Sequence, residues 1–299
     1  MQLILQQLLI LYIFILAGYL IGKKFKSKAA HSDILSVLLV NLLLPCKVFR
    51  SFADNFTVPY LKQKYHFLLA SVTLLLLLVI GAFFFSKLLT KQSYERRVYR
   101  YSLVITNYAY LGYVLIEAVF GERMLADFIF FAIPFIFYTY TFGYALLTGG
   151  DNPWKRLLNP MTISILLGAI AGLTGLTLPN VLDSVISMAS SCVGPLSMLL
   201  TGLTLSTFSL KGMVCEKRAY LFSAIRLVAV PLIVYGICRL LHLDSILPMM
   251  VMITCMPCGL NTIVFPKLVG EDCRLGAGLA LISHIFALPC LLLWLSIIS

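Results

Sequence analysis

The sequence predicts an all-α integral membrane protein, and its composition, its long apolar segments and its charge distribution each point to that class. Of the 299 residues, 61% are hydrophobic and 12% are charged, and the mean hydropathy is +0.98. Soluble domains are nearer half apolar and a quarter charged. Because so few charges cannot cover a soluble surface of this size, we expect lipid to be the solvent for much of the chain.

Ten segments have the roughly 20 mostly apolar residues that a transmembrane helix needs. They cover residues 3–22, 33–53, 65–86, 101–118, 126–148, 160–178, 181–206, 219–241, 246–266 and 275–297. We therefore expect ten transmembrane helices and no separate soluble domain. The first segment carries its basic residues after the apolar stretch, which is typical of a retained helix rather than a cleaved signal peptide.

Basic residues gather in alternate loops of this arrangement, as topology signals do. Sixteen lie in one set of loops: Lys23, Lys24, Lys26, Lys28, Lys87, Lys91, Arg96, Arg97, Arg100, Lys155, Arg156, Lys211, Lys217, Arg218, Lys267 and Arg274. Three lie in the other set: Lys62, Lys64 and Arg123. The positive-inside rule then predicts both termini outside, in the cell membrane, which is the inner membrane if the chain is bacterial. Topology and contact with membrane lipids explain the net charge of +11, so nucleic acid is not an expected partner.

Residues 1–150 and 151–299 show signs of an internal repeat. Pro45 and Pro195 are 150 positions apart, and the pair Gly121-Glu122 recurs as Gly270-Glu271 at a spacing of 149. Each half holds five predicted helices. Because five is odd, the second half must lie upside down relative to the first, which is the inverted repeat of many secondary transporters.

Helix-breaking residues lie in the middle of segment 246–266. Pro257 removes a backbone donor, and Gly259 tolerates conformations that other residues avoid. Asn261 follows, and it can cap the next half-helix or hydrogen-bond a ligand. A kinked packing helix would explain one such segment. Irregular backbone in a membrane otherwise lines a polar cavity, so the segment is a candidate binding site.

The corresponding segment of the first half, 101–118, carries Asn107, Tyr108 and Gly112 near its centre. Asn107 can cap or bind in the same way as its counterpart. The first N–H groups of a half-helix and their partial positive charge suit a carboxylate. Two matched breaks with matched asparagines therefore favour a site for a small organic anion over two packing kinks.

A second matched pair lies on segments 33–53 and 181–206. The first holds Asn41 and Pro45 one turn apart on one face. The second holds small residues that allow close helix approach: Gly194, Ser197, Thr201 and Gly202. Such residues usually mark helix packing, so we expect a packing surface here, with a sliding interface as the functional alternative.

Four ionisable residues within predicted helices have a candidate role or position to assign. His284 lies near the midplane, where it either titrates during transport or stays neutral and hydrogen-bonded to a neighbour. Arg226 either attracts an anion or extends to the inner surface. Lys47 and Arg50 lie near the outer end of their helix, and we expect them to extend to the outer surface.

Several function classes are excluded or disfavoured. No carboxylate lies at a predicted midplane, which disfavours a cation antiporter. The chain has no P-loop, HExxH or GxSxG motif, so it is not expected to be an enzyme or an ATP-driven pump. Cys255 and Cys258 have CxxC spacing but no second pair, so neither a metal site nor a cofactor is expected.

Four segments, taken in order and spacing, resemble the auxin efflux carrier family over nearly the whole chain. They are NLLLPCKVF, TNYAYLGYVLIEAVFG, the run from NPMTISILLGAIAG to GPLSMLLTGLTLS, and MPCGLNTIVFPKLVGEDC. The resemblance implies two inverted five-helix repeats in which broken helices 4 and 9 cross. It also implies a scaffold of helices 1, 2, 6 and 7, and a moving transport unit of helices 3–5 and 8–10. The family's substrates are organic anions such as auxin, malonate or malate.

Carried over by position, Asn107, Tyr108, Pro257 and Asn261 would line the crossover site. Asn41 and Pro45 would belong to the scaffold facing it. The chain departs from the family where members often have a proline after the glycine of helix 4, because here Tyr113 follows Gly112. The helix 4 break is then softer, or the tyrosine ring occupies the pocket.

The expected function is therefore that of a secondary transporter for a small carboxylate working by alternating access. Two alternatives stay open: a Na⁺-coupled carrier like the bile-acid symporters, and a non-transporting membrane sensor. The sequence also leaves open the substrate, the direction of transport, proton or sodium coupling, and a homodimeric state.

Overall fold

The computed structural model describes residues 1–25, 29–150 and 152–298, and this part of the chain is helical apart from one isolated bridge. Lys26 and Lys28 of the predicted topology signal lie outside the described residues. The α-helices of the first half are α1 (Gln2–Lys24), α2 (Ala29–Leu38), α3 (Leu44–Asn55), α4 (Val58–Leu89), α5 (Ser93–Val104), α6 (Tyr113–Phe120), α7 (Glu122–Tyr138) and α8 (Tyr144–Thr148).

The α-helices of the second half are α9 (Pro160–Thr174), α10 (Asn180–Ser206), α11 (Leu210–Val214), α12 (Lys217–Ala224), α13 (Val230–Leu240), α14 (Leu247–Cys255), α15 (Asn261–Leu268) and α16 (Arg274–Ile298). Four π-helical turns interrupt longer helices: η1 (Leu39–Leu43), η2 (Tyr108–Gly112), η3 (Thr139–Gly143) and η5 (Ile225–Ala229). A short 3₁₀ turn, η4 (Pro153–Arg156), joins the two halves. Such π turns are frequent at functional sites.

Seven helices in the described part of the chain are long and apolar enough to cross a membrane. They are Gln2–Lys24, Ser32–Asn55, Val58–Leu89, Glu122–Thr148, Asn180–Ser206, Lys217–Leu240 and Arg274–Ile298. The other three predicted segments are the 15-residue helix α9 and the two interrupted stretches α5–η2–α6 and α14–α15. The ten-span count and the inverted topology stay predictions.

Helix α4 illustrates why lipid is the solvent. Its 32 residues are about 48 Å long, more than the roughly 30 Å of a hydrocarbon core. Many of its exposed side chains are large and apolar: Leu69, Leu76, Leu77, Ile80 and Phe84. Water would not tolerate such a continuous apolar face, so this helix is suited to lipid contact.

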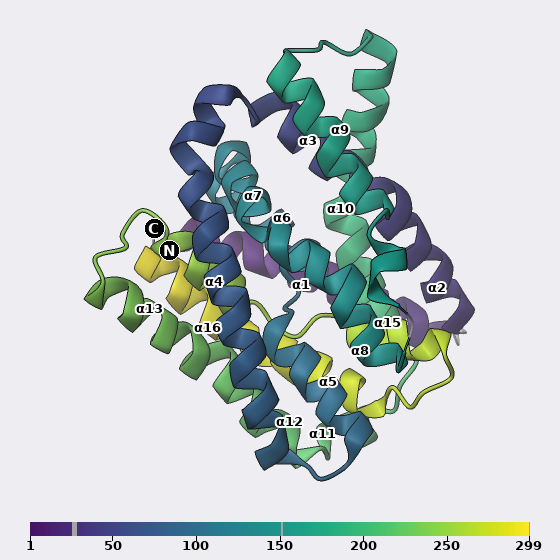
Figure 1. Cartoon of the computed structure of the whole chain (residues 1–299). Coiled ribbons are helices and arrows are strands. Elements are labelled where there is room, and N and C mark those ends of the chain that lie inside the picture. The colour runs from purple at the N-terminus through teal and green to yellow at the C-terminus, as the bar shows by residue number, and fades with distance from the viewer. Residues whose placement is uncertain (26–28, 151, 299) are drawn as a thin grey trace.

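The helices pack in two groups (Figure 1). In one group α1 lies along α10, and α3 packs against both α9 and α10. The other group contains α4–α8 and α12–α16, which pack on one another in sequence-distant pairs such as α12 with α16 and α4 with α7. Between the groups, the Ser197 hydroxyl of α10 donates to the Tyr110 carbonyl of η2 at 3.0 Å.

The seam between α1 and α10 explains the small residues of segment 181–206. A Cβ added to Gly202 would lie 2.0 Å from the Ile15 carbonyl oxygen, and one added to Gly18 would lie 2.3 Å from that of Leu199. Backbones this close exclude any side chain at either position. The expected packing surface is therefore present.

Candidate functional site

Two helices break in the interior of the molecule. The first, α5, ends at Val104, and Ile105 has extended backbone with φ −104° and ψ 122° before the chain re-enters helix at Tyr108. The second, α14, ends at Cys255, and Met256 is extended with φ −70° and ψ 150° before α15 begins at Asn261. Both interruptions lie where the sequence predicts them.

The two breaks cross each other. The Asn107 amide donates to the Pro257 carbonyl at 2.8 Å, and Thr106 and Cys258 form an isolated antiparallel bridge. A Cβ added to Gly259 would lie 3.2 Å from the Thr106 carbonyl oxygen, which is tighter than ordinary contact. Backbone groups that a continuous helix would have satisfied internally are thus paired across the crossing.

The Asn107 side chain, 3% exposed, contacts His284 of α16. Its Nδ2 atom lies 3.0 Å from His284 Nε2. The other ring nitrogen, Nδ1, lies 2.7 Å from the Ala280 carbonyl oxygen, which can only accept. In the neutral ring Nδ1 therefore carries the proton, and Nε2 accepts from the asparagine amide. The expectation of a neutral, hydrogen-bonded histidine is consistent with this geometry.

Asn261 lies at the start of α15, on the other break. Its Nδ2 donates to the Tyr101 hydroxyl at 2.9 Å, and the N-cap position of α15 is taken by Leu260. Asn107 likewise precedes η2 without capping it. Of the two roles predicted for these asparagines, capping is therefore not the one observed, and hydrogen bonding to a ligand stays a prediction. Both side chains are held by distant partners instead, which leaves the N–H groups of the following turns without side-chain acceptors.

A small crossover pocket of about 20 Å³ lies where the breaks meet. It is lined by Thr106, Asn107, Tyr108, Ala109, Tyr110, Thr139, Tyr140, Gly259, Leu260 and Asn261. This volume holds about one water molecule. The structure thus shows the crossover closed around a space lined by the first turn of η2 and by Asn261, the first residue of α15.

A second, larger space reaches the same place. This Lys155 cavity, of about 790 Å³, is lined by Asn41, Tyr140, Lys155, Arg156 and Lys267 among others. Since Tyr140 borders both spaces, its partly buried side chain lies between the crossover pocket and the cavity. The wall also holds Asp33, which pairs with Lys267 at 2.6 Å. Lys155 and Arg156 leave a net positive charge in the wall, which attracts anions.

Of the remaining predicted site residues, Tyr108 lines the crossover pocket and the others lie elsewhere. Tyr108 lines the crossover pocket, and its hydroxyl lies 3.3 Å from that of Thr139. Gly112 is buried at the end of η2, where its amide donates to the Asn107 carbonyl at 3.0 Å. Asn41 lines the Lys155 cavity rather than the crossover pocket. Pro45 is buried in α3 and borders neither space.

Tyr113 stands where the resemblance expected proline. Its ring is fully buried, 6.0 Å from the Tyr108 ring and 6.1 Å from that of Phe128. It is absent from the lining of the crossover pocket. The helix therefore breaks at 105–107 without a proline, and the tyrosine ring does not occupy the crossover pocket.

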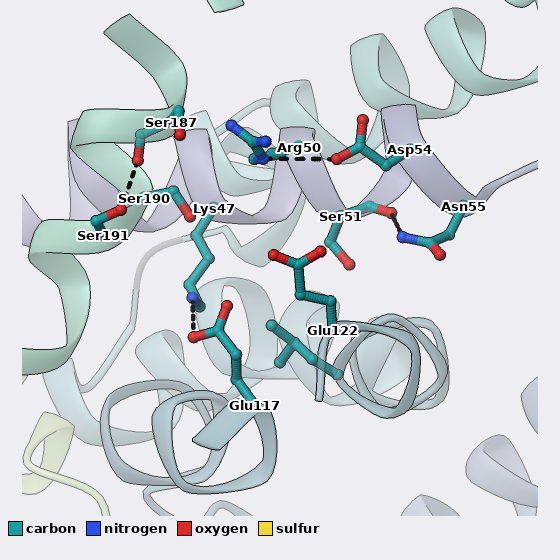
Figure 2. A pocket seen from close by; sticks show the side chains of 11 residues that line it. Lys47, Arg50, Ser51, Asp54, Asn55, Glu117, Glu122, Ser187, Ser190 and Ser191 are labelled. Carbon is teal, nitrogen blue, oxygen red and sulfur yellow. Dashed lines mark hydrogen bonds and ion pairs between the residues drawn. The ribbon is translucent and has the colours of Figure 1, made fainter. Parts of the chain in front are cut away.

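A third space, the Lys47 cavity of about 340 Å³, lies between α3, α10 and the α6–α7 corner. Figure 2 shows Lys47 of α3 pointing to Glu117 of α6, with 2.7 Å between Nζ and Oε2. Lys47 is only 4% exposed, so the expectation that it extends to the outer surface is wrong.

The neighbouring cation on the same helix, Arg50, pairs with Asp54 at 3.5 Å. Sequence reasoning missed the Lys47–Glu117 pair because its members are 70 residues apart.

For Arg226 the sequence predicted either attraction of an anion or extension of the side chain to the inner surface, and the structure is inconsistent with the second. Its side chain is 0% exposed, which excludes extension to the inner surface. Among the described residues, no group of three or more His, Cys, Asp or Glu side chains is placed to hold a metal ion.

Comparison with known proteins gives the context for this geometry. The model of a family described as membrane transport protein matches the chain twice, over residues 3–153 and 146–295. The chain belongs to this auxin efflux carrier-like family of membrane transporters. It is also similar to an uncharacterized transporter of Methanocaldococcus jannaschii, with 27% identity over 304 residues and 96% of each chain covered.

Membership of this membrane transport family establishes two points. The two matched stretches together span nearly the whole chain, so the family assignment applies to both halves. Together with the seven apolar helices, it identifies a multi-pass membrane protein of a transporter family, a class that is generally not enzymatic.

Proposed function

We propose that this chain is a secondary transporter that carries a small organic anion, such as malonate, malate or an auxin-like acid, by alternating access. The observation that carries the proposal is the crossing of two broken helices around a pocket lined by the first turn of η2 and the first residue of α15. Helix starts present N–H groups and partial positive charge, which suit a carboxylate. Discontinuous helices near the midplane bind substrates in other transporter folds.

In this proposal ten transmembrane helices form two inverted five-helix repeats, 1–150 and 151–299. The group containing α1, α3, α9 and α10 is the scaffold, and the group containing α4–α8 and α12–α16 is the unit that moves. The tight seam of α1 on α10 supports a rigid scaffold. Both termini lie outside, so the Lys155 cavity opens to the cytoplasm and the Lys47 cavity to the outside.

The cavities support an inward-open arrangement with a narrow binding site. The Lys155 cavity is the larger, and it adjoins the crossover pocket at Tyr140. An anion entering it meets Lys155, Arg156 and Lys267 first. Rotation of the Tyr140 side chain would then join the two spaces, and Asn107 and Asn261 would hydrogen-bond the carboxylate.

The membrane potential sets the favoured direction. Moving one charge through 100 mV changes its free energy by about 2.3 kcal/mol, or roughly fifty-fold in concentration. With the inside negative this drives an anion outward without a coupled ion. Uptake would need coupling, for which His284, in contact with Asn107, is the candidate proton carrier.

The first experiment measures thermal stabilisation of the purified protein by a panel of mono- and dicarboxylates, in Na⁺ and in K⁺, at two pH values. We expect stabilisation by a carboxylate independent of Na⁺. A shift seen only in Na⁺ would favour a sodium-coupled carrier instead. Ligand binding without flux in proteoliposomes would favour a sensor.

The matched variant is Asn261→Ala. It removes a side chain that lines the pocket, so we expect about 10- to 100-fold weaker carboxylate binding while the protein stays folded. Asn180→Ala, at an exposed position at the start of α10, is the control and should bind as the unmodified protein does. Unchanged binding by Asn261→Ala would refute the assignment.

A further inference from the structure

Arg226 is a fully buried cation deep in the molecule. It lies in η5, between α12 and α13, nine residues after α12 begins at Lys217. At 1.5 Å per residue this places it about 14 Å along the helix, near half of a hydrocarbon core. Its side chain is 0% exposed, so protein and not lipid or bulk water surrounds it.

The guanidinium has no partner in the described part of the chain. None of its three nitrogens, Nε, Nη1 and Nη2, has a hydrogen-bond acceptor there. Other buried or half-buried cations of this molecule are paired: Lys47 with Glu117, and Lys64 with Asp127, each at 2.7 Å. An uncompensated buried charge costs several kcal/mol. Ordered water can satisfy N–H groups, but it leaves the charge unbalanced.

Neutral groups surround this charge. The titratable side chains within electrostatic reach of the guanidinium are those of Cys255, the last residue of α14, and Cys258, within the second break. The segment η5 packs against α14 and α16. From α16, the Ser283 hydroxyl accepts the Cys258 amide at 3.0 Å. Arg226 is therefore next to the crossing, yet it does not line the crossover pocket.

The backbone around Arg226 is fixed by an unusual contact. Pro231 has no N–H, so the carbonyl of Leu227, one turn earlier, loses its helical donor. Trp294 of α16 replaces that donor, with its Nε1 2.9 Å from the Leu227 oxygen. The π turn that carries Arg226 is thus tied to α16, and the charge is held in place beside the break.

We propose that Arg226 forms a second anion site, separate from Asn107 and Asn261, that takes one small monovalent anionic group. An inorganic halide or the carboxylate of an organic acid has the required chemistry. The bound anion balances a charge that the chain itself leaves unpaired. This inference goes beyond the proposed transport function, because the cation needs a counter-ion whether or not the chain transports an acid.

The test uses the full-length protein purified in chloride-free Tris–HEPES buffer without other salt. Sodium bromide is then titrated in, and the melting temperature is followed beside that of Arg226→Met, which reports the general effect of ionic strength. We expect a saturable rise of about 4 °C at 100 times the dissociation constant. A melting temperature that neither bromide nor any acid of the carboxylate panel changes would overturn the proposal.

Arg226→Met removes the charge while keeping an unbranched chain. This variant should lose the saturable bromide dependence, and without bromide it should melt at or above the temperature of the unmodified protein. Arg239→Met, on the same helix but exposed and paired with Asp244 at 2.8 Å, is the control and should keep the dependence. A bromide shift that persists unchanged in Arg226→Met would contradict the site.

Two further comparisons, of acid binding and of bromide binding by the Arg226 and Asn261 variants, separate the two proposed sites. If only an organic acid stabilises the protein, and Arg226→Met abolishes that effect while Asn261→Ala retains it, the site exists and its ligand is the acid's carboxylate. If Asn261→Ala loses acid binding but keeps the bromide shift, the two sites are independent. Should Arg226→Met fail to fold, Arg226→Lys and anomalous scattering from bromide in crystals of the unmodified protein replace it, and a density map without bromide beside Arg226 would refute the proposal.

Discussion

The two breaks that cross in this molecule have different origins. The second, Met256–Leu260, contains both Pro257 and Gly259, so its local sequence interrupts the helix. The first, 105–107, contains neither residue type. Its extended backbone is held by bonds to other elements, including the Thr106 hydroxyl to the Ile253 carbonyl at 3.0 Å. One break is thus encoded locally, and the other depends on it.

The largest effect is expected where the two backbones approach most closely. Gly259→Ala places a Cβ 3.2 Å from the Thr106 carbonyl oxygen, and backbone cannot easily move away. We expect a loss of about 1–3 kcal/mol of stability, measured as a lower melting temperature in detergent. Gly236→Ala is the control, because nothing lies within 4 Å of its added Cβ. Equal melting temperatures would show that the breaks do not constrain each other.

Asn107→Ala tests the dependence of the first break on distant partners. It leaves the buried Nε2 of His284 without the donor now 3.0 Å away, so we expect a loss of about 1–3 kcal/mol, at the lower end if water enters. Thermal unfolding measures it. A variant as stable as the unmodified protein would mean that the Asn107 backbone bond to Pro257 alone holds the break.

Pro257→Ala should have the smallest effect of the three. Alanine can adopt the same backbone angles, and the Pro257 carbonyl still accepts from Asn107. The loss expected is that of pre-organisation, about 0.4–1 kcal/mol. The melting temperature again reports it. A loss larger than that of Gly259→Ala would reverse the comparison and make the proline the main determinant of the crossing.

Sequence reasoning was sufficient for features that depend on local chemistry. Pro257 and Gly259 predicted the second break, and the small residues around Gly202 predicted the close seam. It located the first break only through Asn107 and its counterpart Asn261. Capping was one of two roles left open for the asparagines, because capping is a local rule, whereas their partners, His284 and Tyr101, are more than 150 residues away.

Contacts between distant segments account for the rest. The pairing of Lys47 with Glu117 and the position of Tyr140 between two spaces depend on how helices meet, which periodicity does not reveal. Arg226 was recognised as ionisable within a membrane segment. Its burial without a partner depends on η5 packing against α14 and α16, so sequence alone left its two interpretations equal.

The hydrogen bond from Trp294 to Leu227 provides an intrinsic fluorescence signal close to Arg226. The chain has two tryptophans. Trp154 is 62% exposed in η4, whereas Trp294 is 4% exposed and bonded to the residue after Arg226. Their emission should therefore separate into a red component and a blue one. With Trp154→Phe, the remaining fluorescence comes from a single indole beside the buried cation, so light alone can follow events at that point of the transporter without an added label.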